Sequence, residues 1–275
     1  MSSNGETNKN TINMPYQNKD ALLKNLTDYY PSPFLKILSL FSDGRKYEQK
    51  PSEIVLLEHN RMLTDKVFMS DDGVILHLEF DSSGKARDLA RYMHYAASLS
   101  YQYSFTSEPL AYHPVKTVII FPGYVTPPTK VYTTVCSLQY SVEHIYLADL
   151  IDGDQILADI SAMVKDNPHL VLTGDQNVQL SLAAVGKVRG KREKFCKKAV
   201  SLAKSLSRNP DNNNILALVV CSVYNFIETE VIKSIVGTEV HMEDMLDNLS
   251  SGKYSHAIVA ANTAIAEKAR AEEDA

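Results

Sequence analysis

The sequence predicts an α/β protein in which a mixed β-sheet is flanked by helices and followed by an all-helical C-terminal half. Three observations support this fold class. Residues 66–80 alternate like two strands joined by a tight turn. An amphipathic helix and then an apolar strand follow over residues 85–121, and no strand-like pattern recurs after Leu150. The strand–helix–strand order implies a crossover that places the third strand parallel to the second.

The composition is that of a globular chain. Its 275 residues are 44% hydrophobic and 22% charged, which excludes disorder as the dominant state. The formal net charge of −5 excludes a uniformly basic coat for nucleic acid. The longest apolar run covers residues 215–221, and the N-terminus has no apolar signal core. We therefore expect a chain that is neither secreted nor membrane-spanning.

The three cysteines indicate a cytoplasmic protein. Cys136, Cys196 and Cys221 are odd in number, lie far apart and show no CxxC spacing. This pattern argues against a disulfide framework and against a zinc site, and a reducing compartment is then the expected location.

We expect three regions along the chain. Residues 1–18 have almost no large apolar side chains and form a disordered tail. Residues 19–165 form the α/β core, and residues 166–275 form the helical region, either as a separate half or as part of one continuous globule.

The elements before the hairpin are expected to be helical. Two short patterns, residues 21–26 and 34–41, are separated by Pro31 and Pro33. A third helix is expected from Ser52, as the N-cap, to about Asn60.

The hairpin itself is predicted at residues 66–69 and 74–80, because Asp72-Gly73 supplies the positive φ of a tight turn. In its second strand one set of alternating residues is apolar (Val74, Leu76, Leu78 and Phe80). The other set ends in carboxylates (Ile75, His77, Glu79 and Asp81).

After the hairpin, a long amphipathic helix is expected to about Tyr103, and the strand at residues 115–121 is expected to be covered on both faces. Strands at residues 130–136 and 143–150 complete the mixed sheet. The remaining patterns are helical, at residues 156–164, 179–207, 213–226, 229–235, 239–249 and 255–272.

Asp65 and Glu79 are the residues that suggest chemistry. An Asp at the start of one strand and a Glu near the end of its hairpin partner can meet across the ladder, where opposite side chains are about 5 Å apart. Two such carboxylates bind a hard divalent cation that activates water for attack on a phosphodiester. The alternative is two surface acids near a hairpin.

The order of motifs around this pair resembles the PD-(D/E)XK nuclease superfamily. The resemblance covers roughly residues 50–175 and is greatest to the branch of recombination-promoting nucleases and PD-(D/E)XK family transposases. Its counterparts in this chain are Glu58 in LLEHN, Asp65, the HLEF residues 77–80, the RYMHY residues 91–95, the apolar strand 115–121 and the later NPHLVL segment.

The resemblance implies a restriction-endonuclease-like sheet and a DNA endonuclease that uses Mg²⁺ or Mn²⁺, with a link to recombination or mobile elements. It implies that Asp65 and Glu79 hold the metal. Glu58 would be the acid of a leading helix, although a solvated glutamate is the alternative. Arg91 and Tyr95 lie four residues apart on one helix face and would contact phosphate, the alternative being a salt bridge and a half-buried core tyrosine.

One departure from the family pattern concerns Asp81. The family has Lys or Gln two residues after the Glu, where it contacts the attacking water or the scissile phosphate, and an Asp supplies neither contact. Either Asp81 joins Asp65 and Glu79 as a third metal ligand while Lys85 takes the missing role, or the site is degenerate. His77 shares the face of Glu79 and is expected to be a packed, hydrogen-bonded side chain.

A second feature is the basic segment, residues 187–208. It carries nine Lys and Arg against one acid, a local charge of +8 that leaves −13 for all other residues. Such a segment can neutralise several phosphates of nucleic acid, or it can be a solvated helix face. The residues assigned to nucleic acid are Lys187, Arg189, Lys191, Arg192, Lys194, Lys197 and Lys198.

Two functions follow from these features. The first is a magnesium-dependent DNA endonuclease, which would act as a homodimer if it cuts both strands. The second is a nuclease-fold protein that binds DNA or a protein partner without cutting.

Overall fold

The structure is a computed structural model of the whole chain. It describes residues 17–40, 45–55, 61–81, 86–105, 113–121, 131–133, 139–212, 214–224 and 226–237. None of the helices in these ranges has the length and apolar character needed to cross a bilayer.

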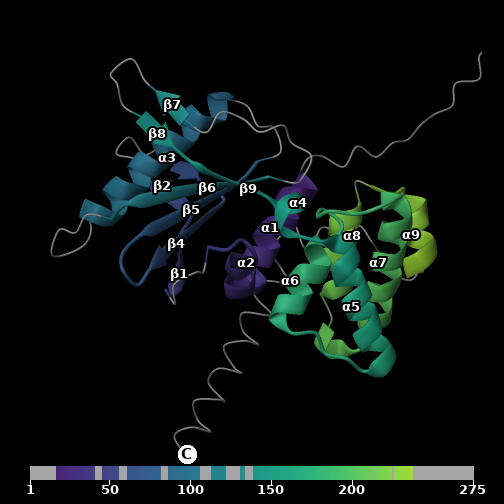
Figure 1. Cartoon of the computed structure of the whole chain (residues 1–275). Helices are drawn as coiled ribbons and strands as arrows, with labels where there is room; N and C mark the ends of the chain where they lie inside the picture. Colours follow the sequence, from purple (N-terminus) through teal and green to yellow (C-terminus); the bar gives the residue numbers. More distant parts are fainter. Residues whose placement is uncertain are drawn as a thin grey trace, which may run out of the picture.

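Five strands form the main sheet. Their spatial order is β1 (Tyr47–Lys50), β4 (Lys66–Ser70), β5 (Ile75–Phe80), β6 (Val115–Phe121) and β9 (Glu143–Tyr146). The first three strands are antiparallel neighbours, whereas β6 is parallel to β5 and to β9. The sheet is therefore mixed, as predicted, and helix α3 (Ala86–Phe105) follows β5 and precedes its parallel neighbour (Figure 1).

Two small sheets and the other helices complete the described fold. The small sheets are antiparallel pairs, β2 (Glu53–Val55) with β3 (Arg61–Leu63), and β7 (Val131–Thr133) with β8 (Gln139–Ser141). The other helices are α1 (Gln17–Tyr29), α2 (Pro31–Ile37), α4 (Leu147–Leu150), α5 (Gly153–Asp166), α6 (Gly174–Leu182), α7 (Arg192–Leu206), α8 (Ile215–Val223) and α9 (Thr229–Val236), with a 3₁₀ turn at Pro210–Asn212.

Both faces of the sheet are buried. Leu76 and Leu78 of β5 point to the face that packs in the largest apolar cluster, with Phe68 of β4. Ile75 points to the other face, where it packs with Val67 and with Leu99 of α3. The carboxylate-bearing face of β5 is thus covered by a helix, and its polar side chains lie in a closed environment.

Helices α1 and α2 connect the sheet to the C-terminal helices. In Figure 1 they lie between the sheet and the helices α5–α9, with α1 packed on α8 and α2 packed on α6. One apolar cluster includes Leu26 of α1, Leu78 of β5 and Val219 of α8. The sheet and the helical region therefore share a core.

The helix expected from Ser52 is wrong. Residues 53–55 form β2, whose partner is β3, and the Ser52 carbonyl accepts a hydrogen bond from the Thr64 main chain at 3.0 Å. Long-range strand pairing overrides the local N-cap signal here. The predicted extension to Asn60 lies outside the described residues.

The strand expected at residues 130–136 does not join the main sheet. Its described part, β7, pairs with β8 instead, and the sheet receives β1, for which no strand was predicted. The strand expected at residues 143–150 ends at Tyr146 and continues as α4.

The single helix expected over residues 179–207 is also wrong, because the chain turns between α6 and α7. A Cβ on Gly186 would lie 2.5 Å from the Ile151 carbonyl oxygen, and Gly190 has a φ of +99°. A parallel bridge between Asp152 and Lys187 occupies the turn. The helices expected at residues 239–249 and 255–272 lie outside the described ranges.

Candidate active site

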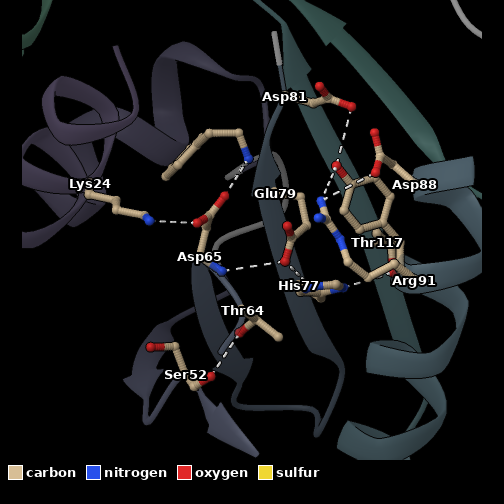
Figure 2. A network of polar contacts seen from close by, with 12 residues as sticks. Lys24, Ser52, Thr64, Asp65, His77, Glu79, Asp81, Asp88, Arg91 and Thr117 are labelled. Atoms are coloured by element: carbon tan, nitrogen blue, oxygen red, sulfur yellow. Dashed lines mark hydrogen bonds and ion pairs between the residues drawn. The ribbon is translucent and has the colours of Figure 1, made fainter. Parts of the chain in front are cut away.

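Asp65 and Glu79 meet at one end of the β4–β5 hairpin. The register pairs Lys66 with Leu78, so Asp65, one residue earlier, faces Glu79. The Asp65 main-chain N–H donates to Glu79 Oε1 at 3.4 Å, and Asp65 Oδ2 accepts from the Phe80 main-chain N–H at 2.8 Å (Figure 2). The structure brings together the two acids that the sequence paired.

Lys24 of α1 is the cation at this pair. Its Nζ lies 2.7 Å from Asp65 Oδ1, with 38% of the Lys24 side chain and 17% of the Asp65 side chain exposed. The ammonium is therefore at the solvent-facing side of the site. It offsets the negative charge of Asp65.

Glu79 is the inner member of the pair and belongs to a chain of buried hydrogen bonds. His77 Nε2 lies 2.8 Å from Glu79 Oε1, and His77 Nδ1 lies 3.2 Å from Thr117 Oγ1. The Tyr140 hydroxyl donates to the same Thr117 oxygen at 2.7 Å. Burial raises the pKa of Glu79, while its hydrogen bond with His77 acts in the opposite direction.

Asp81 points to a different set of partners. Its Oδ2 accepts from the Tyr92 hydroxyl at 3.2 Å, and Arg91 Nη2 donates to the same hydroxyl at 3.2 Å. Burial and then the negative charge of Asp81 raise the pKa of Tyr92. Asp81 is 8% exposed, so its side chain is buried within the protein.

Arg91 and Tyr95 stay close together in the structure, with the Arg91 guanidinium 6.0 Å from the Tyr95 ring centre, but they differ in exposure. The guanidinium of Arg91 lies 5.0 Å from the Tyr92 ring centre and 3.8 Å from Asp88, and 51% of its side chain is exposed. The Tyr95 ring is half-buried and packs edge-on against His77 at 6.0 Å. Arg91 is therefore accessible to a ligand, whereas Tyr95 mainly supports the histidine.

Two carboxylates, those of Asp65 and Glu79, are the groups of this site that could bind a metal ion. Within the described ranges, no group of three or more His, Cys, Asp or Glu residues is arranged to hold a metal ion. Asp65 and Glu79 fit Mg²⁺ nevertheless, because this ion commonly uses one or two carboxylates, substrate phosphate and water. Of the two Glu79 oxygens, Oε1 carries the hydrogen bonds just described. Glu58 and Lys85 lie outside the described residues.

The seven residues that were assigned to nucleic acid have three different environments. Arg192 is turned inward, with Nη1 on the Ala184 carbonyl oxygen, Nη2 on the Gly186 carbonyl oxygen at 3.2 Å, and its guanidinium 4.9 Å from the Phe226 ring centre. Lys187 is exposed. The other five residues that were assigned to nucleic acid line a surface groove beside α5: Arg189, Lys191, Lys194, Lys197 and Lys198.

Four residues of the site were not identified from the sequence. Lys24 is 41 positions from its partner, and Thr117 and Tyr140 belong to strands whose neighbours only the fold defines. Tyr92 belongs to the RYMHY residues, but no role was predicted for its hydroxyl, which reaches Asp81. The one available signal was the position of Thr117, a polar residue inside the apolar strand 115–121.

Comparisons of the sequence with protein-family models and with curated proteins, and of the fold with solved structures, gave no match.

Proposed function

We propose that this chain is a metal-dependent DNA endonuclease of the PD-(D/E)XK type, with a restriction-endonuclease-like sheet. The observation that supports it most is the Asp65–Glu79 pair, formed across β4 and β5 where β5 runs parallel to β6. A hairpin, a covering helix and a parallel strand in this order match the motif order of the resembling family. A role in recombination or in mobile elements belongs to the same proposal.

Asp65 and Glu79 are the residues that would hold Mg²⁺ or Mn²⁺, and the ion would supply an activated water and an electrophile for the phosphate. His77 fixes the orientation of the Glu79 carboxylate through Nε2, and Thr117 fixes the imidazole in turn. Glu79 binds the ion as a carboxylate, so its raised pKa makes binding strengthen as the pH rises.

Lys24 takes the role that the family gives to the Lys or Gln replaced here by Asp81. Its ammonium is already held at Asp65 by a contact of 2.7 Å, and its side chain is partly exposed. If Asp65 held the ion, the Lys24 ammonium would be available to donate to the scissile phosphate. Arg91, half exposed on α3, is the second candidate for a phosphate contact.

Supercoiled plasmid tests the proposal. The purified chain is expected to nick plasmid with Mg²⁺ or Mn²⁺ and to stop when the ion is chelated. Asp65→Asn and Glu79→Gln, like the corresponding alanine variants, are expected to lower the rate by at least about 100-fold. The matched control is Asp71→Asn, an exposed acid in the turn at the other end of the same hairpin. Equal cleavage by the site variants and the parent would refute the assignment.

A catalytically degenerate nuclease-fold protein is the second candidate. Two contacts favour it: Asp81 is engaged by Tyr92 instead of completing a three-acid cluster, and Lys24 already neutralises Asp65. On this alternative the purified chain binds neither Mg²⁺ nor Mn²⁺ measurably in a calorimetric titration. Asp81→Lys or Asp81→Gln would then be needed to obtain cleavage.

The cellular setting belongs to the proposal as well. Cys196 and Cys221 are buried free thiols, in agreement with a reducing cytoplasm. One site per chain cuts one strand at a time, so a double-strand break requires a homodimer. Sedimentation of the chain with and without duplex DNA measures this.

A further inference from the structure

A groove runs between α5 and α7 on the helical side of the molecule. It has a volume of about 1330 Å³, and residues of α5, of the loop 189–191 and of α7 line it, with Ile235 of α9 at one side. Figure 1 places α5 and α7 side by side, and far from α3 and β2. The groove is therefore separate from the Asp65–Glu79 site.

The walls of the groove are basic. Lys165 is on α5, and Lys191, Lys194 and Lys198 are on the opposite side. All four are exposed, and within the described ranges none of them forms an ion pair. Two further cations of the groove are partnered: Arg189 lies 2.5 Å from Asp152, and Lys197 lies 2.6 Å from Glu193. The lining has one acid, Asp154, whose Oδ2 accepts the Arg189 main-chain N–H.

The cations at the start of α7 are regularly spaced. Lys191 is the N-cap residue, and Lys194 and Lys198 follow at intervals of three and four residues. Residues at these intervals share one helix face, with about 5–6 Å between their Cβ atoms. Glu193 stands between Lys191 and Lys194 in the sequence, but it pairs with Lys197 and does not line the groove. A row of like charges is complemented by a polymer that carries one negative charge per unit. A phosphodiester chain has this property, and counterion release then favours its binding.

Apolar side chains also line the groove, and they favour a single strand over a duplex. They are Leu157, Ala158, Ala162, Phe195 and Leu202, of which Leu157 and Phe195 are largely buried. A single strand offers sugars and base faces to such a lining while its phosphates reach the lysines. A duplex presents two phosphate backbones on its outside and stacks its bases inside, so it would contact only the rims.

We propose that the α5–α7 groove binds the phosphate backbone of single-stranded nucleic acid. This inference goes beyond the proposed function, since it holds whether or not the Asp65–Glu79 site cleaves. It also assigns Lys165, which lies outside the basic segment, to the same ligand, and it leaves Lys187 and Arg192 out.

Fluorescence anisotropy with a labelled oligothymidylate of about 16 nucleotides, in the presence of EDTA, tests the groove. The triple variant Lys165→Ala, Lys191→Ala, Lys194→Ala is expected to bind at least about tenfold more weakly. Its plot of log affinity against log salt is expected to be shallower by about 0.7 per lysine removed. Lys194→Arg, which keeps the charge, should restore much of the affinity lost in Lys194→Ala.

The matched control is Lys187→Ala, an exposed lysine of the same segment that does not line the groove. It should keep the salt slope of the parent. Asp65→Asn should keep oligonucleotide binding while losing cleavage, so failure of the nuclease assignment and failure of the groove assignment are distinguishable. Three results would overturn the proposal: unchanged binding by the triple variant, binding of a duplex of equal length as tightly as the single strand, or a polyglutamate peptide that binds the groove more tightly than the oligonucleotide.

Discussion

Lys24 and Asp65 form an ion pair of 2.7 Å between helix α1 and the residue that precedes β4 of the β4–β5 hairpin. The pair connects two segments that are 41 positions apart, and it places a partly exposed cation on a candidate metal ligand. Its partial exposure means that a competing cation from solvent can reach the carboxylate. Replacement of Lys24 can therefore distinguish metal binding from substrate binding in experiments.

Replacement of Lys24 should raise the metal affinity of the site and lower its rate of DNA cleavage. Lys24→Gln removes the ammonium that competes for Asp65, and Mn²⁺ affinity measured by calorimetry should rise about two- to fivefold, the equivalent of an exposed ion pair. Plasmid cleavage should fall, because the phosphate loses its donor. Lys36→Gln is the control, since Lys36 pairs with Asp175 at 2.5 Å on an exposed surface. An unchanged Mn²⁺ affinity would contradict the competition.

Thr117 should contribute to the stability of the fold through its hydrogen bonds with His77 and Tyr140. Thr117→Val keeps the shape of the side chain but leaves His77 Nδ1 and the Tyr140 hydroxyl without their partner, which should lower the free energy of unfolding by about 1–3 kcal/mol. In a Tyr140→Phe background, Thr117→Val should lower the free energy of unfolding by a smaller amount, because the Tyr140 hydroxyl is already absent. Urea denaturation of the four proteins in this cycle measures the coupling, and strict additivity would show that the hydrogen bonds do not form a connected chain.

The stability of the fold should decrease above pH 8.5. Burial raises the pKa of Cys196 to about 11 and the pKa of Cys221 to about 12. The unfolded chain loses these protons near pH 8.5, so between about pH 8.5 and 11 the folded state binds more protons than the unfolded state. The free energy of unfolding then falls with a slope that approaches about 1.4 kcal/mol per pH unit for each thiol. Cys221→Ala should reduce the slope measured by denaturation at several pH values, whereas an unchanged slope would assign it to other groups.

Arg192 should act on stability and not on nucleic-acid binding. Its guanidinium donates to the carbonyl oxygens of Ala184 and Gly186 and lies on the Phe226 ring, so it holds the turn before α7 against the helical core. Arg192→Ala should lower the free energy of unfolding by about 1.5–3 kcal/mol. Arg189→Ala, at an ion pair whose arginine is 70% exposed, should cost under about 1 kcal/mol. Equal effects of the two substitutions would contradict the structural role of Arg192.

The parts of the fold that could be predicted from the sequence are those with a strong local pattern. Alternation over residues 75–80, the Gly73 turn and the helical periodicity of α3 are properties of adjacent residues, and they are enough to place Glu79 and Asp65 on opposite strands. The parallel pairing of β5 with β6 followed from the strand–helix–strand order.

The errors arose where distant contacts override local signals. Glu53 starts a strand because residues 61–63 provide its partner, although Ser52 is a good N-cap residue. The chain turns at Gly186 because Ile151 approaches too closely for any Cβ, and this contact has no local sequence signature. Lys24 was missed for the same reason, since a surface lysine on a helix has no mark that identifies its partner.

The core that joins Leu26, Leu78 and Val219 is shared by the sheet and the helical region, so we expect the two to unfold as one cooperative unit. A cut in the chain near residue 166 would open apolar surface on both fragments, so neither fragment is a minimal version of the protein. Occupancy of the carboxylate pair should therefore raise the midpoint of denaturation recorded by far-UV circular dichroism, a signal that comes mostly from helices remote from the ion. A thermal shift of the intact chain then measures binding at the sheet.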